Sequence, residues 1–524
     1  MASRRKQEEC VIAEDQTAAV AFLSAPASYG ITEPIETMET HISRIFLVGR
    51  RAFKMKRAVK LPYVDFSTAR LRLDACQKEV ELNSATAPGL YLGVRRITRE
   101  KDGTLAFDGH GELLDAVVEM ARFDQQALFD RMAVEGRLTP ELMTVAAQMI
   151  ARFHRAAPVV HEGGGAANIA GVLRINAAGF ATSRVFQPAE LGAFTLAFDR
   201  GLARHATLLD RREAAGKVRR CHGDLHLRNI CLFEGAPRLF DCIEFNDQIA
   251  TVDTLYDLAF LLMDLWHRGF PDLANLVMNR YLDESDDEDG FVLLPYLMAI
   301  RAAVRAHVTA TQVEESGEAS AKLVAEARSY FDLARLLIQP VPVRLIAIGG
   351  FSGSGKTTVA ETLAARVGAA PGARIVESDR VRKAMHRVSA ETRLPPSAYR
   401  PEVSEKVYRE MAERARPLLA AGGTVIVDAV FDKPENRNLM EKLAGELGIP
   451  LTAVWLDAEA TLLCDRVASR SGGPSDADVD VLSGQLARDS GERGWRRIDA
   501  ARGAEQIAAE ILNLPISYLG TPQP

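Results

Sequence analysis

The sequence predicts an α+β domain, followed by an α/β domain built on a parallel sheet. Its 524 residues are too many for one hydrophobic core, so two or three domains are expected. Long Ala- and Leu-rich helical segments dominate before residue 338, whereas apolar strands alternate with helices after residue 344. We therefore expect a first domain over residues 1–338, a linker over 339–343 and a second domain over 344–524.

The first domain begins with a short helical lead-in over residues 1–36 and continues into a predicted hairpin. Its strands, 43–48 and 52–59, are separated by Gly49-Arg50-Arg51. A helix is expected over 68–83 and a buried strand over 112–120. The remaining predicted helices cover residues 125–155, 188–215, 252–282 and 291–336.

Two prolines, Pro340 and Pro342, end the last of these helices and mark the linker. An apolar strand over 344–350 follows at once. Further strands are expected over 373–377, 424–428 and 451–456, each separated from the next by a helical stretch. This alternation predicts a parallel sheet with crossover helices.

Composition and charge exclude several classes of protein. The net charge of −6 gives no global basic field and argues against a nucleic-acid partner. The N-terminus lacks the apolar run of a signal peptide, and no stretch approaches 18 apolar residues. Six cysteines without a CxxC pair fit reduced thiols, so we expect a cytoplasmic protein with no membrane partner. The acidic run 283–289 is expected to be a solvated loop, and the oligomeric state stays open.

A first chemical motif is the run His222-Gly-Asp-Leu-His-Leu-Arg-Asn229, which is followed by Asp241 after an apolar strand. Kinase-type catalysis needs a carboxylate near the acceptor hydroxyl, oxygen ligands for magnesium and a cation on the nucleotide phosphates. Asp224 and Asn229 are five residues apart, and Asp241 follows Asp224 by 17 residues. This spacing is typical of the protein-kinase-like superfamily.

The motif resembles the catalytic loop of aminoglycoside phosphotransferases and of their choline- and homoserine-kinase relatives. The resemblance implies a two-lobed protein-kinase-like fold in which Asp224 is the catalytic base and Asn229 and Asp241 hold magnesium. Further roles that it implies are a phosphate lysine, its glutamate partner and an adenine-reading hinge. The phosphate lysine would be Lys54 or Lys56, and Glu79 would be its partner. Glu119 and Met120 would form the hinge.

A second motif, G-x-x-x-x-G-K-T, lies between the predicted strand 344–350 and a helix, which is the context that makes it specific. Backbone N–H groups of such a loop surround phosphates at a helix N-terminus. Lys356 would bridge the β- and γ-phosphates, and Thr357 would bind magnesium. The predicted nucleotide-binding residues are Gly350, Phe351, Ser352, Gly353, Ser354, Gly355, Lys356, Thr357 and Thr358.

The rest of this half resembles the gluconate-kinase, shikimate-kinase and zeta-toxin group of P-loop kinases. Asp379 follows the second strand and by this resemblance activates the acceptor. Asp428 ends the next strand and is a candidate metal ligand, while Arg466 and Arg470 resemble lid arginines that close on the transferring phosphate.

The whole chain resembles bacterial tandem proteins that join an aminoglycoside-phosphotransferase-like domain to a P-loop kinase. We therefore expect a bifunctional kinase that uses ATP and Mg²⁺ and phosphorylates hydroxyl groups of small molecules. Two alternatives stay open. The first domain could be a regulatory module that binds ATP without catalysis, because no glycine-rich loop precedes its lysine strand. The P-loop domain could instead phosphorylate a polynucleotide or a nucleotide-sugar.

Overall fold

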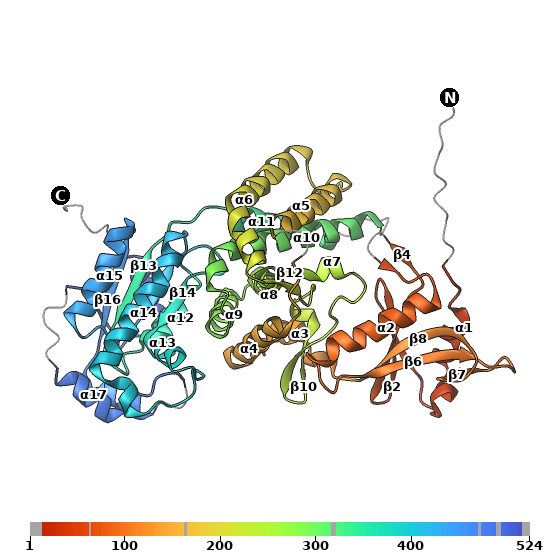
Figure 1. The fold of residues 1–524 in the computed structure, drawn as a ribbon, viewed down its shortest axis with the longest axis horizontal. Coiled ribbons are helices and arrows are strands. Elements are labelled where there is room, and N and C mark those ends of the chain that lie inside the picture. Colours follow the sequence, from red (N-terminus) through yellow and green to blue (C-terminus); the bar gives the residue numbers. More distant parts are fainter. Residues whose placement is uncertain are drawn as a thin grey trace. The chain divides into compact units, whose positions relative to one another are not determined.

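The computed structural model describes residues 13–61, 64–161, 165–315, 321–469, 473–488 and 494–515 (Figure 1). The chain forms two compact units. The first comprises residues 1–146, 156–162 and 216–257, and the second comprises 147–155, 163–215 and 258–524. The proposed linker, 339–343, lies inside the second unit, so the predicted domain boundaries stay a prediction. Residues 1–12 of the predicted helical lead-in lie outside the described residues, so their helical character stays a prediction.

The first unit contains a six-stranded antiparallel sheet in the order β1-β2-β3-β8-β6-β7. The predicted hairpin is confirmed as β2 (Ser43–Val48) and β3 (Arg51–Lys56), and Gly49 takes the positive φ of 54° that its tight turn needs. The other strands are β1 (Glu36–Glu39), β6 (Tyr91–Arg99), β7 (Leu105–Phe107) and β8 (Glu112–Ala121).

Helices cover both faces of this sheet. Leu73 and Cys76 of α2 (Ala69–Ser84) pack against Ala116 and Val118 of β8. The predicted lead-in contains α1 (Thr17–Ser24), which packs on the other face. The remaining elements are three short strand pairs and short helices, namely β4 (Lys60–Leu61), β5 (Val64–Asp65), β9 (Val218–Arg220), β10 (Ile230–Phe233), β11 (Ala236–Leu239), β12 (Thr251–Asp253), α3 (Phe129–Val134), α7 (Asp247–Ala250), η1 (Pro26–Tyr29), η2 (Gln125–Ala127) and η3 (Leu227–Asn229).

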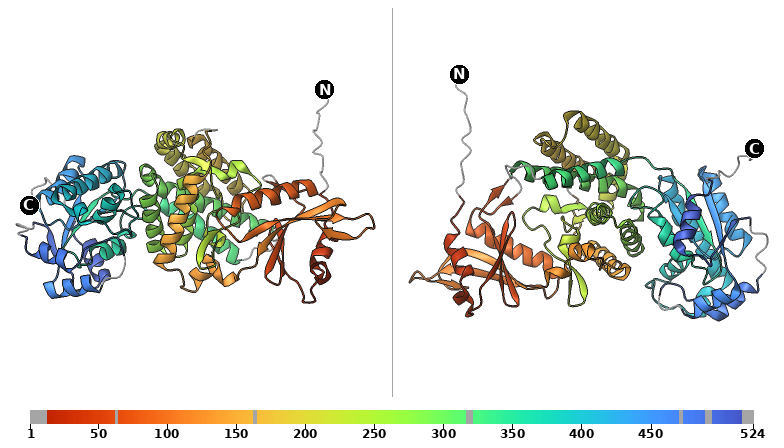
Figure 2. Two further views of the ribbon diagram at one scale, coloured as in Figure 1. Left: turned by 60° about the horizontal axis from the view of Figure 1, so that its bottom comes forward. Right: turned by 180° about the vertical axis from the view of Figure 1, so that it is seen from behind.

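The second unit contains a five-stranded sheet in the order β14-β15-β13-β16-β17, and every pairing is parallel, as predicted. Its strands are β13 (Leu345–Gly349), β14 (Arg374–Glu377), β15 (Val425–Asp428), β16 (Leu451–Asp457) and β17 (Arg496–Asp499). Helices cover both faces (Figure 2), and β13 and β15 are apolar and buried almost throughout, as such strands must be.

Residues of α12 (Lys356–Ala364) and α18 (Ala504–Leu512) share a core with one face of this sheet. The other helices of this part are α13 (Ser378–Met385), α14 (Pro401–Ala420), α15 (Pro434–Leu447), α16 (Ala460–Ala468), α17 (Val479–Leu486) and the short η5 (Pro396–Tyr399).

The second unit also contains helices that precede the sheet in sequence. Phe180, Phe194 and Phe331 form an aromatic core among α5 (Gly165–Ala181), α6 (Pro188–Ala214) and α11 (Ala321–Leu337). The other helices here are α9 (Pro271–Glu284), η4 (Glu288–Leu293) and α10 (Leu294–Glu315), while α4 (Pro140–Ala156) and α8 (Thr254–His267) contribute to both units.

Three of the sequence predictions need correction, two about helices and one about the acidic run. The predicted helix 125–155 is interrupted at Gly136, whose φ is 67°, and the predicted helix 252–282 is interrupted at Gly269 before Pro271. The acidic run 283–289 is not a solvated loop. Asp287 is buried and pairs with Arg212, and Asp283, whose side chain is 16% exposed, pairs with Arg374.

Among the described residues, one helical segment, Glu288–Val313, is long and apolar enough to cross a membrane. In its most apolar window, 72% of the residues are buried inside the structure, and the core helices of soluble proteins pass the same test.

A buried ion pair joins α2 to the sheet of the first unit and gives a test of this packing. The Nε of Arg72 lies 2.9 Å from Oδ1 of Asp115, and both side chains are almost fully buried. Asp115→Asn removes the buried counter-charge of the guanidinium and, among the described ion pairs, leaves it only Glu14, whose side chain is 47% exposed. We therefore expect the free energy of unfolding to fall by up to about 3–5 kcal/mol. Urea denaturation followed by circular dichroism measures the change.

The matched control is Asp74→Asn on the same helix, because Asp74 pairs with Arg70 at the surface. We expect this control to change stability by less than about 1 kcal/mol. Equal losses in the two variants would contradict the structural role of the buried pair.

Candidate functional site

Two candidate sites lie in the two units, and the first is built around Glu79 of α2. The Nζ of Lys54 lies 2.8 Å from Oε1 of Glu79 and also contacts Asp241. The Nζ of Lys56 lies 2.5 Å from Oε2 of Glu79 and also contacts Glu244. Both lysines lie on one face of β3, since side chains two residues apart in a strand point the same way.

The exposure of these side chains separates the two lysines. The side chain of Asp241, the partner of Lys54, is 43% exposed, whereas that of Glu244, the partner of Lys56, is 3% exposed. Lys54 therefore lies beside a solvent-exposed carboxylate, whereas Lys56 lies deeper in the structure. Burial alone would raise the pKa of Glu79, but the two ammonium groups hold it at about 2, so this carboxylate is charged at neutral pH.

The predicted catalytic loop is held in shape by its own polar groups. The side-chain amide of Asn229 donates to the backbone carbonyl and to Oδ2 of Asp224, both at 2.9 Å. The backbone N–H groups of His222 and Gly223 donate to the carboxylate of Asp257 at 3.1 and 2.8 Å. Asp224 stays 40% exposed in its side chain, so it remains accessible to an acceptor.

His222 is buried, and burial lowers its pKa although Asp257, Asp224 and Asp241 all act to raise it. A largely neutral ring therefore lies close to these carboxylates. Its Nε2 lies 2.9 Å from the carbonyl oxygen of Phe240. This contact connects the catalytic loop to the segment just before Asp241. Asp241 itself takes a left-handed backbone conformation with φ of 63°.

Glu119 and Met120 do not lie at an edge of the sheet. Both lie inside β8, where they pair with residues of β3 on one side and of β6 on the other. The carboxylate of Glu119 pairs with Arg51 and Arg95. Their role as the adenine-reading hinge thus stays a prediction that no contact in the structure supports.

The second site is a glycine loop between β13 and α12. Gly350, Gly353 and Gly355 have φ values of 147°, 85° and 84°, a range that side chains rarely adopt. A Cβ on Gly353 would lie 2.6 Å from the carbonyl oxygen of Leu463. The hydroxyl of Ser354 is buried and has no hydrogen-bond partner among the described residues. A polar phosphate group fits such a loop, because it would satisfy this hydroxyl and the N–H groups that begin α12.

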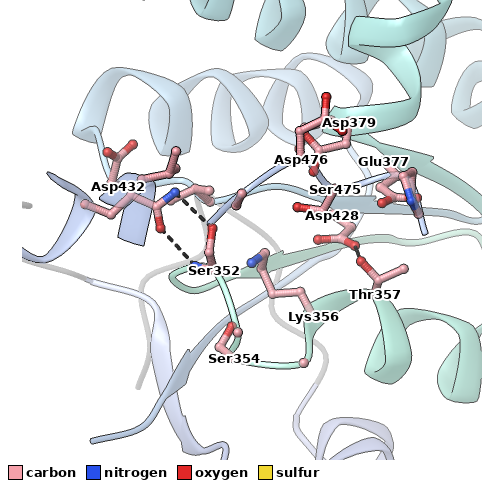
Figure 3. Close-up of a pocket in the computed structure, with 18 of the residues that line it drawn as sticks. Ser352, Ser354, Lys356, Thr357, Glu377, Asp379, Asp428, Asp432, Ser475 and Asp476 are labelled. Carbon is pink, nitrogen blue, oxygen red and sulfur yellow. Dashed lines mark hydrogen bonds between the residues drawn. The ribbon is translucent and has the colours of Figure 1, made fainter. Parts of the chain in front are cut away.

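Lys356, Thr357 and Asp428 lie close together beside this loop (Figure 3). The hydroxyl of Thr357 donates to Oδ2 of Asp428 at 2.6 Å. Asp428 ends β15 in register with Glu377, the last residue of β14. Burial and the neighbouring carboxylates raise the pKa of Asp428 to about 6 and that of Glu377 to about 8. Two buried carboxylates with raised pKa values form a donor set suited to Mg²⁺.

Asp379 lies in the first turn of α13 and lines the same cavity of about 1200 Å³. Burial raises its pKa, while a hydrogen bond from Ser475 and the charge of Arg382 act to lower it. Arg382 itself is buried, donates to the carbonyl of Ala398 at 2.7 Å and lies over the ring of Tyr399. The predicted acceptor carboxylate thus has a cationic neighbour.

The predicted lid arginines can be placed only in part. Arg466 lines the cavity and donates to the carbonyl of Ala500 at 2.9 Å. Arg470 lies outside the described residues. Sequence reasoning missed Glu377, Asp432, Asp476 and Gln485, which also line the cavity. Only Glu377 had a local signal, its position at the end of a predicted strand beside Asp379. The other three reach the cavity through the tertiary fold.

The raised pKa of Glu377 predicts how stability depends on pH without Mg²⁺ and nucleotide. The ordinary pKa of a glutamate is 4.5. Between pH 4.5 and about 8, Glu377 in the folded protein keeps a proton that it releases in the unfolded chain. This contribution to stability is present below pH 4.5 and is lost as the pH rises through 8.

The expected slope is at most about 1.4 kcal/mol per pH unit, and Glu377→Gln should remove it. Urea unfolding of metal-free protein between pH 5 and 8 measures it, with the exposed Glu435→Gln as the control. An unchanged slope in Glu377→Gln would show that Glu377 is not protonated in the folded state.

Comparison with known proteins gives two family matches, one for each candidate site. Residues 104–293 match the model of the phosphotransferase enzyme family, and residues 345–490 match an AAA domain model. An uncharacterized protein of Mycobacterium tuberculosis (strain H37Rv) is 29% identical over 489 residues, which is 92% of this chain and 95% of that protein. A protein of Mycobacterium bovis, also described as uncharacterized, matches to the same extent.

Solved structures are similar to parts of the chain. A choline/ethanolamine kinase family protein from Mesorhizobium loti covers 62% of this chain and 94% of its own, with 14% identity and a TM-score of 0.41. A sugar kinase from Janibacter covers 33% of this chain and 93% of its own, with 24% identity and a TM-score of 0.26. The two family matches confirm the tandem arrangement expected from the sequence: the chain joins a domain of the phosphotransferase enzyme family to a P-loop domain.

Proposed function

We propose that this protein is a bifunctional ATP-dependent phosphotransferase in which each domain transfers the γ-phosphate of ATP to a hydroxyl of a small molecule. One observation carries the proposal. In each domain, residues far apart in sequence that phosphoryl transfer needs lie together. Lys54 contacts Glu79 and Asp241 in the first, and Thr357 contacts Asp428 in the second.

In the first domain, Lys54 is the better candidate for the phosphate lysine because it is next to the exposed Asp241. Glu79 holds its ammonium group in place. Asp224 would accept the proton of the acceptor hydroxyl, and Asn229 keeps its carboxylate oriented. Asn229 and Asp241 would hold Mg²⁺, which neutralises charge on the phosphates when it is bound.

In the second domain, the backbone of the glycine loop and Lys356 would hold the phosphates of ATP. Thr357, with Asp428 behind it, would hold Mg²⁺. Asp379 would accept the proton of the acceptor hydroxyl, and its raised pKa makes it a stronger base than an ordinary carboxylate. Arg466 would face the transferring phosphate from the rim of the cavity.

The two alternatives receive less support. An inactive first domain would not need the pairing of Lys54 with both Glu79 and Asp241, nor the hydrogen bond that orients Asp224. A polynucleotide acceptor would favour a run of unpaired basic groups. Two basic side chains along the second cavity are instead matched by carboxylates, since Arg488 pairs with Asp432 and Lys433 lies near Glu405.

A cytoplasmic location belongs to the same proposal. The five cysteines among the described residues form no disulfide, and four of them are buried. Cysteines outside disulfides fit a reducing compartment.

Separate inactivation of the two sites tests the proposal. Asp224→Ala removes the base of the first site, and Lys356→Ala removes the phosphate lysine of the second. Wild-type and variant proteins are incubated with ATP, Mg²⁺ and a pooled metabolite extract, and mass spectrometry identifies phosphorylated products. We expect each variant to lose a different product, with the rate falling by at least about a hundredfold.

Matched controls are Asp74→Ala and Lys442→Ala, which change exposed residues of the same types. Both should keep all products. If only Lys356→Ala removes a product, the first domain is a regulatory module and the bifunctional proposal is wrong. If neither variant changes the products, both assignments are wrong.

A further inference from the structure

The helix α9, which precedes the P-loop domain in sequence, covers the free edge of its sheet. Strand β14 is an edge strand, so one side of its backbone lacks a strand partner. The side chain of Asn279 accepts the N–H of Ile375 at 2.8 Å, and Asn275 donates to the carbonyls of Pro371 and Ala373 at 3.0 Å. Two asparagines of α9 thus take the place of a neighbouring strand.

One turn further along α9, Asp283 lies among three arginines. Its carboxylate lies 2.8 Å from Nη2 of Arg374, 3.2 Å from Nη1 of Arg280 and 3.4 Å from Nη1 of Arg380. Burial would raise the pKa of Asp283, but the three guanidinium groups hold it below its ordinary value. Asp283 is therefore a charged group in a buried network.

The three arginines do not depend on Asp283 equally. Arg374 has a second carboxylate partner in Glu288 at 2.9 Å, and Arg280 has one in Glu361 at 2.5 Å. Glu288 and Glu361 are not among the described residues that line the cavity. The other carboxyl group that Arg380 contacts is that of Glu377, whose Oε2 lies 3.0 Å from its Nε. Among the described ion pairs, Asp283 is thus the group that holds Arg380 from outside the site.

Arg380 connects this network to the site itself. It lies between Asp379 and Val381 in the first turn of α13, and its partner Glu377 ends β14 in register with Asp428. Both Glu377 and Asp379 line the cavity. A shift of Arg380 would therefore move the turn that places Asp379 opposite the nucleotide loop.

We propose that Asp283 is a positioning residue for the acceptor side of the P-loop domain: it holds Arg380 against Glu377 and so fixes the first turn of α13. The inference rests on the proposed function of that site, because it assigns Asp379 to the acceptor. It means that a helix outside the predicted P-loop domain completes the site of that domain.

A double-mutant cycle on the full-length protein tests this link. The variants are Asp283→Asn, Arg380→Gln and the double variant, and the control is Asp272→Asn at an exposed position of α9. One readout is hydrogen–deuterium exchange of peptides that cover residues 378–385 and 350–357. A second readout is the Kd for ATP with Mg²⁺. A third is the Lys356-dependent rate of ATP consumption, measured with the metabolite extract or, if no acceptor is known, with ATP and Mg²⁺ alone.

We expect Asp283→Asn to speed exchange in residues 378–385 but not in 350–357, and to leave the Kd for ATP unchanged. The Lys356-dependent rate should fall between about tenfold and about a hundredfold, as expected for a displaced catalytic group. In the exchange of residues 378–385 and in the Lys356-dependent rate, the double variant should be no worse than Arg380→Gln, since both changes break the contact between Asp283 and Arg380. Asp272→Asn should match wild type.

Additive effects of the two substitutions, or equal loss of protection in both peptides, would overturn the inference and leave Asp283 a general stabiliser. If Asp283→Asn does not fold, Arg380→Gln breaks the same link from the other end, and unchanged exchange in residues 378–385 would then be the contrary result. The exchange readout needs no turnover. A wild-type protein without Lys356-dependent activity would therefore refute the proposed function while the exchange data still decide the positioning role.

Discussion

Buried carboxylates that face few cations are the constraint on which both sites depend. In the first unit, Glu79 is shared by Lys54 and Lys56, and these lysines also hold Asp241 and Glu244, so three carboxylates face two ammonium groups. In the second, Glu377 and Asp428 end neighbouring strands and their pKa values are raised. Buried charge of one sign is costly unless it is neutralised. In the proposed function, Mg²⁺ supplies the further cation at each site.

In the proposed function, the two domains bind phosphate in different ways. The first supplies a lysine from the middle of an antiparallel sheet and fixes it with a carboxylate from a packed helix. The second supplies backbone N–H groups from a glycine loop at the start of α12. The first design depends on long-range contacts, whereas the second is contained in a few consecutive residues. This difference explains why the second site was easier to recognise in the sequence.

Local patterns allowed the nucleotide loop, the parallel sheet and the catalytic loop to be predicted, because each depends on residues close in sequence. The choice between Lys54 and Lys56 could not be made from the sequence, since both lie on one face of β3. It needed the positions of Asp241 and Glu244, which lie far along the chain. The acidic run was misinterpreted for the same reason. Its character depends on Arg374, a residue that only the fold brings to Asp283.

The measurement that tests the central claim most directly is the number of ATP sites on each chain. Calorimetric titration with a non-hydrolysable ATP analogue and Mg²⁺ gives this stoichiometry for wild type, Lys54→Met and Lys356→Ala. Our account predicts two sites in wild type and one in each variant, with a different site lost in each. A single site in wild type, removed by Lys356→Ala and unaffected by Lys54→Met, would contradict it.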